Sequence, residues 1–164
     1  MADFETFYRS HVQMVYALVL SRAGDRAAAE DMTQETFLRA WQSFQVIAGL
    51  ETAAQRAWLV RTARNLTVDA WRREEIRRSS SLQTDPPAAD ESSPELHLDI
   101  SQALAELDDE QRELVIMRYI VGMDSREIGR VAGIPPGTVR RRLADARKLL
   151  ADRLRQWAPR GGSE

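Results

Sequence analysis

The side chains best suited to chemistry in this sequence are arginines, and one group of them is tightly spaced. Arg140, Arg141 and Arg142 are consecutive, and Arg147 and Lys148 follow within two helical turns. A guanidinium group can bind phosphate or guanine with two parallel hydrogen bonds, so this cluster favours contact with DNA. A solvated, arginine-rich face on an ordinary helical hairpin is the alternative that these residues leave open.

The residues around this cluster predict a helix–turn–helix. Asp124 and Glu127 fit a capping box at the start of a helix over residues 125–132, and Gly133 suits its left-handed end. Pro136 suits the first turn of a second helix, which carries the arginines as a helix that enters a DNA major groove does. One apolar seam can join the two helices: Ile128, Ala132, Ile134, Val139, Leu143 and Ala146.

A second basic cluster lies on a longer predicted helix, over about residues 54–78. Its arginines alternate with Trp58 and Trp71, and basic side chains among aromatic ones suit unstacked single-stranded bases as well as duplex phosphates. We expect Trp58 to pack in the core and Trp71 to be open. Polar side chains occupy the rest of this helix: Arg61, Arg64, Asn65, Asp69, Arg72 and Arg73.

Two further helices are predicted before it, over about residues 3–23 and 26–44, and a loop over residues 45–53. Gly24 can end the first helix and Asp25 can cap the second. One face of the second helix is acidic and amide-rich with an exposed leucine, which suits a basic partner, although spacing alone favours a plain solvated face. Its members are Asp31, Gln34, Glu35 and Leu38.

The charge is segregated along the 164 residues, although the net charge is only −2. Residues 61–78 carry six basic side chains, residues 79–110 carry nine acidic and no basic ones, and residues 111–164 carry twelve basic ones. Two basic blocks separated by an acidic one indicate two separate contacts with polyanions.

Several classes of protein are excluded or disfavoured. The chain has no cysteine, so a disulfide or a thiol nucleophile is impossible. His11 is expected to be a structural histidine, because nothing nearby completes a metal site. We expect no enzyme activity, no cofactor and no small-molecule substrate. No run approaches about 18 apolar residues, so no membrane span is expected, and the chain is expected to be cytoplasmic.

These elements predict an all-α fold of two small helical domains joined by a flexible acidic linker. The N-terminal domain covers residues 1–78, and the linker covers residues 79–95, which are rich in Ser, Pro and acidic side chains. The C-terminal domain covers residues 96–158. It begins near Leu96, and a compact buried helix over residues 110–121 precedes its helix–turn–helix.

Three motifs, in order, carry a resemblance to a known family. They are AEDMTQETFLRAW (29–41), WLVRTARNLTVDAWRR (58–73) and ALAELDDEQRELVIMRYIVGMDSREIGRVAGIPPGTVRRRL (103–143). With them, nearly the whole chain resembles the extracytoplasmic-function (ECF) sigma factors, the smallest bacterial RNA polymerase sigma subunits. The resemblance implies an alternative sigma factor that directs core RNA polymerase to promoters and is controlled by an anti-sigma factor.

The resemblance also implies a role for each surface. The polymerase β′ clamp helices would dock on Asp31, Gln34, Glu35, Leu38 and Trp41, which reverses the preference for a plain solvated face. The promoter −10 element would be bound and melted by Arg61, Arg64, Asn65, Asp69, Arg72 and Arg73. The loop over residues 46–53 would help to hold a flipped base. The −35 element would be read by Thr138, Arg140, Arg141, Arg142, Asp145 and Arg147, with another face of that domain meeting the polymerase β flap.

The chain departs from the family pattern in its second basic helix. Ala144 and Asp145 stand where larger or basic residues are frequent, and Arg141 stands where a smaller polar residue is common. Gly129 replaces the usual Ala, at some cost in helix propensity, but allows the two helices to cross closely. Two other functions stay open: a stand-alone helix–turn–helix activator, and a protein that mimics a sigma factor.

Overall fold

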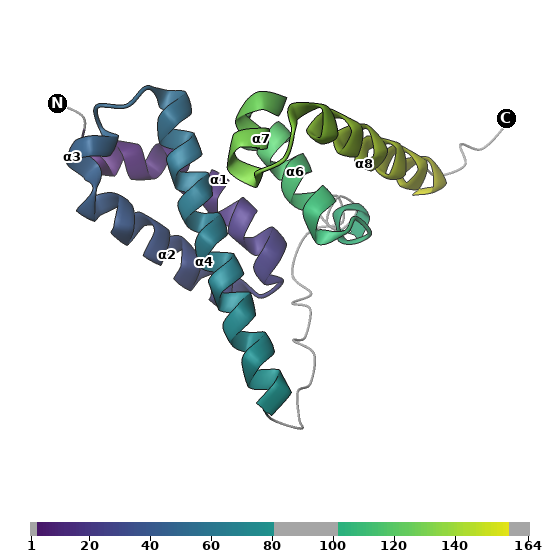
Figure 1. Cartoon of the computed structure of the whole chain (residues 1–164), viewed down its shortest axis with the longest axis horizontal. Coiled ribbons are helices and arrows are strands. Elements are labelled where there is room, and N and C mark those ends of the chain that lie inside the picture. Colours follow the sequence, from purple (N-terminus) through teal and green to yellow (C-terminus); the bar gives the residue numbers. More distant parts are fainter. Residues whose placement is uncertain (1–2, 81–101, 158–164) are drawn as a thin grey trace, which may run out of the picture.

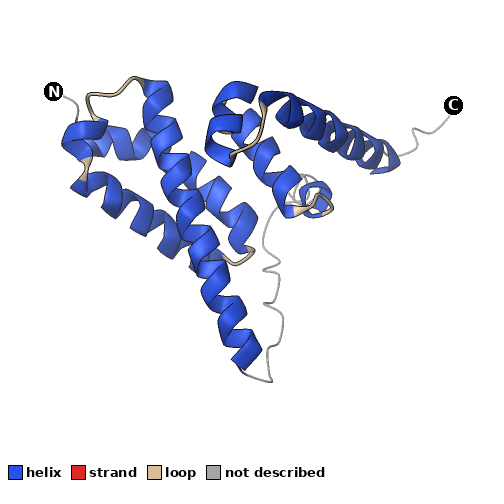
Figure 2. Cartoon of the chain, in the orientation of Figure 1, coloured by secondary structure: helices blue, strands red, loops and turns tan. Residues whose placement is uncertain are grey.

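The computed structural model describes residues 3–80 and 102–157, and all its regular elements are α-helices (Figure 2). The all-α prediction is therefore confirmed for the described residues. The helices are α1 (Phe4–Ala23), α2 (Arg26–Gln42), α3 (Phe44–Ile47), α4 (Thr52–Ser80), α6 (Asp109–Tyr119), α7 (Ser125–Ala132) and α8 (Pro136–Trp157).

Helices α1, α2 and α4 pack into an N-terminal bundle. Gly24 ends α1 in the left-handed conformation (φ 65°), with its N–H bonded to the Leu20 carbonyl, and Asp25 caps α2 by accepting a hydrogen bond from the Ala28 N–H at 3.0 Å. Both predicted helix ends are thus confirmed. The bundle core includes Phe7, Val15, Leu18, Val19, Ala29, Phe37, Ala40, Leu59, Val60 and Ala63.

The predicted loop after α2 was wrong at its start, because α2 ends at Gln42 and the short helix α3 follows. The Ser43 carbonyl accepts hydrogen bonds from the N–H groups of Val46 and Ile47, and Ile47 is buried in the core. Burial of Ile47 thus stabilises a helical turn where the irregular spacing and Gly49 had indicated a loop.

Helices α6, α7 and α8 form the C-terminal domain, and the predicted helix–turn–helix is confirmed. Asp124 and Glu127 form the capping box, and Gly133 is left-handed (φ 71°). Ile128, Val139, Leu143 and Ala146 are buried, and Ala132 and Ile134 pack against them. Asp108 and Gln111 form a second capping box, at the start of α6.

Gly129 is the point where α7 meets the corner that leads to α8. A Cβ atom on Gly129 would lie only 2.6 Å from the Ile134 carbonyl oxygen. Glycine here is therefore a requirement of the close crossing, and its low helix propensity is the lesser effect.

The two domains pack against each other, α1 on α6 and α4 on α7 (Figure 1). The C-terminal third of α4 extends away from the bundle, and the helix continues to Ser80, two residues into the predicted linker. The rest of that linker and the start of the C-terminal domain, including Leu96, lie outside the described residues.

Candidate nucleic-acid and polymerase interfaces

The predicted −35 residues lie on one broad solvent-facing arc of α8. Val139, Leu143 and Ala146 hold the opposite side in the core. At 3.6 residues per turn, Arg141 lies in the middle of the exposed arc. Arg140 and Arg147 lie at one edge of the arc, and Thr138, Arg142 and Asp145 lie toward the other. Four of the six are solvent-exposed: Arg140, Arg141, Asp145 and Arg147.

Residues of the same domain hold the edges of this arc. Arg142 pairs with Glu110 at the start of α6, and Arg147 Nη1 lies 3.4 Å from the hydroxyl oxygen of Tyr119 at its end. Arg141, in the middle of the arc, is exposed to solvent. The arrangement can present cations to a DNA groove without help from the N-terminal domain.

The predicted −10 residues separate into an exposed stripe and one exception. Arg61, Asn65, Asp69, Arg72 and Arg73 are exposed and follow one side of α4. Trp71, also open as predicted, is 64% exposed and lines a groove with Arg73 between α4 and the α1–α2 corner. The stripe places cations and an amide within reach of single-stranded DNA, and the open Trp71 ring lies on a neighbouring face of the same helix.

Arg64 is the exception, because it points to the other domain. Its Nε donates a hydrogen bond to Glu113 Oε1 at 2.9 Å, and its Nη1 donates to the Val131 carbonyl at 3.4 Å. Arg22 of α1 donates to the second oxygen, Glu113 Oε2, at 3.1 Å. Glu113 is only 2% exposed, whereas the Arg22 and Arg64 side chains are 25% and 28% exposed.

We name Arg22, Arg64 and Glu113 the interdomain ion cluster. A buried carboxylate is stable only when it is paired, and here each oxygen has its own guanidinium. Arg112, beside Glu113 on α6, also reaches across and donates to the Ser21 carbonyl at 3.1 Å. Charged hydrogen bonds thus join the two domains at three arginines.

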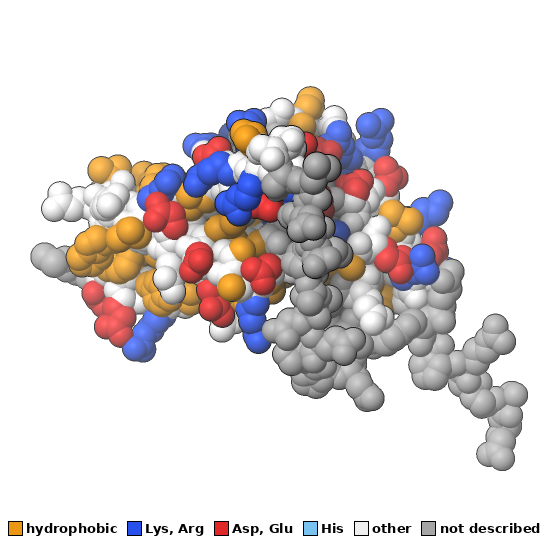
Figure 3. Space-filling model, turned by 90° about the horizontal axis from the view of Figure 1, so that it is seen from below, with side chains coloured by type: hydrophobic (Ala, Val, Ile, Leu, Met, Phe, Trp, Pro, Cys, Tyr) orange, Lys and Arg blue, Asp and Glu red, His pale blue; other side chains and the backbone are white. Residues whose placement is uncertain are grey.

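The predicted polymerase-docking residues share one outward face of α2. Asp31, Gln34 and Leu38 are exposed, and Glu35 pairs with Arg39 on the same helix at 2.8 Å. Trp41, although 60% exposed, packs edge-on against Phe4 with ring centroids 4.8 Å apart. Figure 3 shows hydrophobic side chains gathered at the end of the molecule that carries α3. The face therefore combines carboxylates and an amide with a supported apolar edge.

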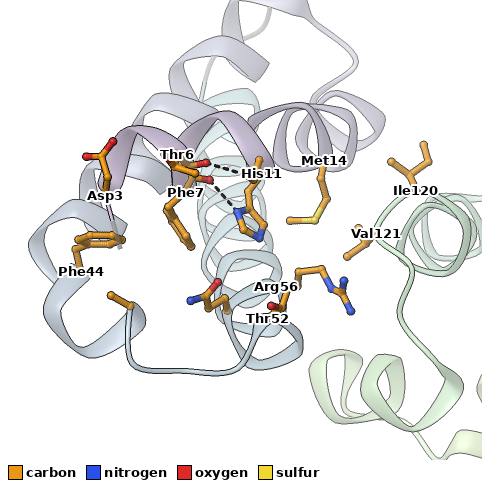
Figure 4. Close-up of a pocket in the computed structure, with 13 residues that line it drawn as sticks. Asp3, Thr6, Phe7, His11, Met14, Phe44, Thr52, Arg56, Ile120 and Val121 are labelled. Carbon is orange, nitrogen blue, oxygen red and sulfur yellow. Dashed lines mark hydrogen bonds between the residues drawn. The ribbon is translucent and has the colours of Figure 1, made fainter. Parts of the chain in front are cut away.

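A cavity of about 500 Å³ lies beside the loop that leads into α4 (Figure 4). Thr52, Gln55 and Arg56 line it from the N-terminal domain, and Ile120 and Val121 line it from the C-terminal domain. Gln55 fixes the loop by donating hydrogen bonds to the Ile47 carbonyl at 3.2 Å and the Leu50 carbonyl at 3.1 Å. The Nε of Arg56 is buried and has no hydrogen-bond partner among the described residues.

His11 and Trp58 have the structural roles that were predicted for them. The buried His11 ring has its Nδ1 2.8 Å from the Phe7 carbonyl oxygen, and Trp58 packs partly buried against the core. Over residues 3–80 and 102–157, no group of three or more His, Cys, Asp or Glu side chains could hold a metal ion. No helix in that part of the chain is long and apolar enough to cross a membrane.

One carboxyl group of the helix–turn–helix has a clearly shifted pKa. The Glu127 N–H, which donates to Asp124 at 2.8 Å, is the main cause that holds the pKa of Asp124 below its usual value. The Arg126 N–H and the positive charges of Arg126 and Arg130 act in the same direction, and partial dehydration opposes them. Hydrogen bonds and cations both favour the ionised carboxylate that caps α7.

Sequence reasoning missed Glu113 and Arg22. Glu113 precedes buried Ile116 and Met117 by three and four residues, so helical spacing places it on the buried side of α6. A charged residue at such a position signals a partner that it must have. The pattern does not say which arginine, because Arg64 and Arg22 are 49 and 91 residues away in sequence.

Two family models match the chain in order. Residues 7–76 match sigma-70 region 2, and residues 97–150 match sigma-70 region 4. The first match holds the candidate docking and −10 residues, and the second holds the helix–turn–helix.

Individual proteins match over most of their length. The ECF RNA polymerase sigma factor SigL of Mycobacterium tuberculosis is 34% identical over 155 residues, which cover 91% of this chain and 87% of SigL. The ECF RNA polymerase sigma factor SigW of Bacillus subtilis is 30% identical over 173 residues. The alignment covers 94% of this chain and 88% of SigW.

Solved structures match the arrangement as well. The sigma factor RpoE, in complex with the anti-sigma factor NepR from Bartonella quintana, has a TM-score of 0.74 at 25% identity over 94% of this chain and 98% of its own. CnrH, in complex with the cytosolic domain of CnrY, shares the fold with a TM-score of 0.62 at 24% identity, over 93% of this chain and 88% of its own. Since regions 2 and 4 are both matched and SigL aligns over most of both chains, the chain belongs to the ECF sigma factors, which bind core RNA polymerase and direct it to promoters.

Proposed function

We propose that residues 1–78 and 96–158 act as two separate units, with polymerase docking and −10 melting on the first and −35 reading on the second. The β′ clamp helices contact the outward face of α2, and the β flap contacts the C-terminal domain. The single observation that carries the proposal is that the predicted residues form separate faces on α2, α4 and α8, exposed but for Arg64 and the half-buried Glu35, Thr138 and Arg142.

The −10 strand lies along the exposed stripe of α4, with phosphates on Arg61 and Arg72 and a base against Trp71. A flipped base enters near the loop over residues 46–53. Unstacking a base costs a few kcal/mol, which contacts to the cavity and the cationic stripe offset. The polar atoms of Gln55 and Arg56 at the cavity support this assignment.

On α8, Arg141 lies deepest in the major groove, because it runs along the middle of the exposed arc. Arg140 and Arg147 contact phosphates on one side. Asp145 accepts a hydrogen bond from cytosine N4, a contact that an acidic side chain can make in the major groove. The base preference of this promoter reader then follows from Arg141 and Asp145 together.

The factor works in the cytoplasm without catalysis of its own and is controlled by an anti-sigma factor. The support for such a partner is the similarity to RpoE, whose solved structure holds NepR. A stand-alone activator would have no use for the region 2 match over residues 7–76.

Reconstitution with core RNA polymerase tests the proposal. The chain is added to core enzyme and a library of promoter fragments, and run-off transcripts are sequenced to find the promoters that it selects. We expect transcripts that start downstream of a shared pair of −35 and −10 elements. A chain that binds core enzyme without selecting promoters, or that fails to bind it, contradicts the proposal and favours a sigma mimic.

A further inference from the structure

The interdomain ion cluster joins two guanidinium groups of the N-terminal domain to one carboxylate of the C-terminal domain. Arg22 and Arg64 approach from α1 and α4, and Glu113 comes from α6. The carboxylate is almost completely buried, and each of its oxygens accepts one charged hydrogen bond. Among residues 3–80 and 102–157, Glu113 is the one carboxylate within ion-pair distance of Arg22 and Arg64, so it neutralises both in this arrangement.

The geometry of this pair of arginines suits a phosphodiester as well as a carboxylate. Both anions carry one negative charge spread over two oxygens, and both accept parallel hydrogen bonds from guanidinium groups. The pair also lies at the right place. Arg64 precedes exposed Asn65 and is three residues from exposed Arg61, so it borders the stripe assigned to the −10 strand.

A second observation shows that the C-terminal domain also reaches the start of α4. Ile120 and Val121, from the turn after α6, form part of the wall of the cavity that Gln55 and Arg56 line (Figure 4). Glu113 and these two residues belong to one continuous segment of the C-terminal domain. The closed arrangement therefore covers the cavity and one arginine of the −10 surface together.

We infer that Glu113 stands in for a phosphate of the −10 strand between Arg22 and Arg64, and thereby keeps the free factor closed. Arg22 and Arg64 are then a phosphate-binding site of promoter DNA, with Arg22 as a member that no motif indicated. The domains separate when Glu113 is released to water, and the strand takes its place. This inference rests on the proposed function of α4 as the −10 helix.

Glu113→Gln tests the inference directly. The amide is similar in size but removes the charge, and leaves two guanidinium groups facing each other at the interface. Opening is measured by energy transfer between dyes on Ala27→Cys and Ala151→Cys, two exposed positions in α2 and α8 of a chain without other cysteines. DNA binding is measured by anisotropy of a labelled single-stranded oligonucleotide of mixed sequence, because phosphate contacts do not depend on sequence.

We expect Glu113→Gln to lower the transfer efficiency and to raise the affinity for the oligonucleotide about tenfold, the effect of freeing roughly one charged hydrogen-bond pair. Arg22→Ala should lower the transfer efficiency too, but with a smaller gain in affinity, because it removes half of the phosphate site. Glu30→Gln, which removes the same charge from an exposed position of α2, should change neither quantity.

Two results overturn the inference. If Glu113→Gln keeps the wild-type transfer efficiency, the ion cluster does not hold the domains together. If the domains open but the affinity for the oligonucleotide stays unchanged, Arg22 and Arg64 are not a phosphate site. The dye measurement needs no polymerase. A chain that opens on Glu113→Gln yet fails to bind core enzyme would contradict the proposed function and leave the closing role of Glu113 standing.

Discussion

The two arginine-bearing helices, α4 and α8, find their carboxylate partners in different places. Arg142 of α8 pairs with Glu110 of its own domain, whereas Arg64 of α4 pairs with Glu113 of the other domain. The surface of α8 is therefore complete within one domain. The surface of α4 depends on how the domains are arranged, so that a closed factor can offer its −35 reader while part of its −10 surface is covered.

Gly129→Ala should have the largest effect. It should disrupt the −35 surface of α8 and leave the −10 surface of α4 unchanged. The added Cβ meets the Ile134 carbonyl oxygen, part of the backbone, at 2.6 Å. We expect a loss of about 2 kcal/mol in the stability of the C-terminal domain, as for other overpacked sites. Hydrogen exchange of α7 and α8 measures the loss, and −35 duplex binding should fall with it.

Gly137→Ala is the matched control for this prediction. Its Cβ would meet only the end of the flexible Arg140 side chain, at 3.8 Å. The same substitution should therefore stabilise the domain by about 0.5 kcal/mol, because alanine restricts the unfolded chain. Equal stabilities for the two variants would show that the corner is less tightly packed than its geometry indicates.

Arg141→Ala should have the next largest effect. It tests whether α8 reads the −35 element independently of α4. We expect binding of the −35 duplex to fall about tenfold, the value of one good contact to a base. Competition for core polymerase should stay unchanged. Arg61→Ala on α4 is the control and should leave −35 binding intact. A similar loss of −35 binding in both variants would mean that the two helices do not read separate elements.

Asp31→Ala tests a third face that neither basic helix supplies. We expect competition for core polymerase to weaken about fivefold, a typical effect for one exposed charge at an interface. Binding of the isolated −35 duplex should not change. Glu5→Ala, which removes another exposed acidic side chain, from α1, should leave both measurements as in the wild type. The prediction fails if Glu5→Ala weakens core binding as much as Asp31→Ala.

Asp124→Asn should have the smallest effect, visible as a pH dependence. The pKa of Asp124 is lower in the folded state than its usual value of 3.8. The ionised carboxylate therefore stabilises α7 fully when the pH is above 3.8, and this contribution is lost as the pH falls through the folded-state pKa. Asparagine still caps a helix but does not titrate. The wild-type Tm should exceed that of the variant at neutral pH, and the difference should vanish in acid. A difference that persists in acid would exclude the charge as its cause.

Local patterns were sufficient wherever neighbours in sequence are also neighbours in space. Capping pairs such as Asp124 with Glu127, and glycines such as Gly133, act within one helical turn, so the helix ends could be read correctly. The short helix α3 could not, because it forms around Ile47, whose burial depends on the bundle. For the candidate site, periodicity separated the exposed faces of α2 and α8 from their cores but placed Arg64 with the wrong neighbours.

The sequence by itself determined the helices other than α3, the sharp corner before Pro136, the segregation of charge and the family. Each follows from residue types at short spacing or from motifs in order. Only the tertiary structure decided that Arg22 and Arg64 meet at Glu113, and that Gly129 leaves no room for a methyl group. Arg64 and Arg22 are separated from Glu113 by 49 and 91 positions in the sequence. Contacts over such separations depend on how whole helices pack, and local conformational preferences do not determine them.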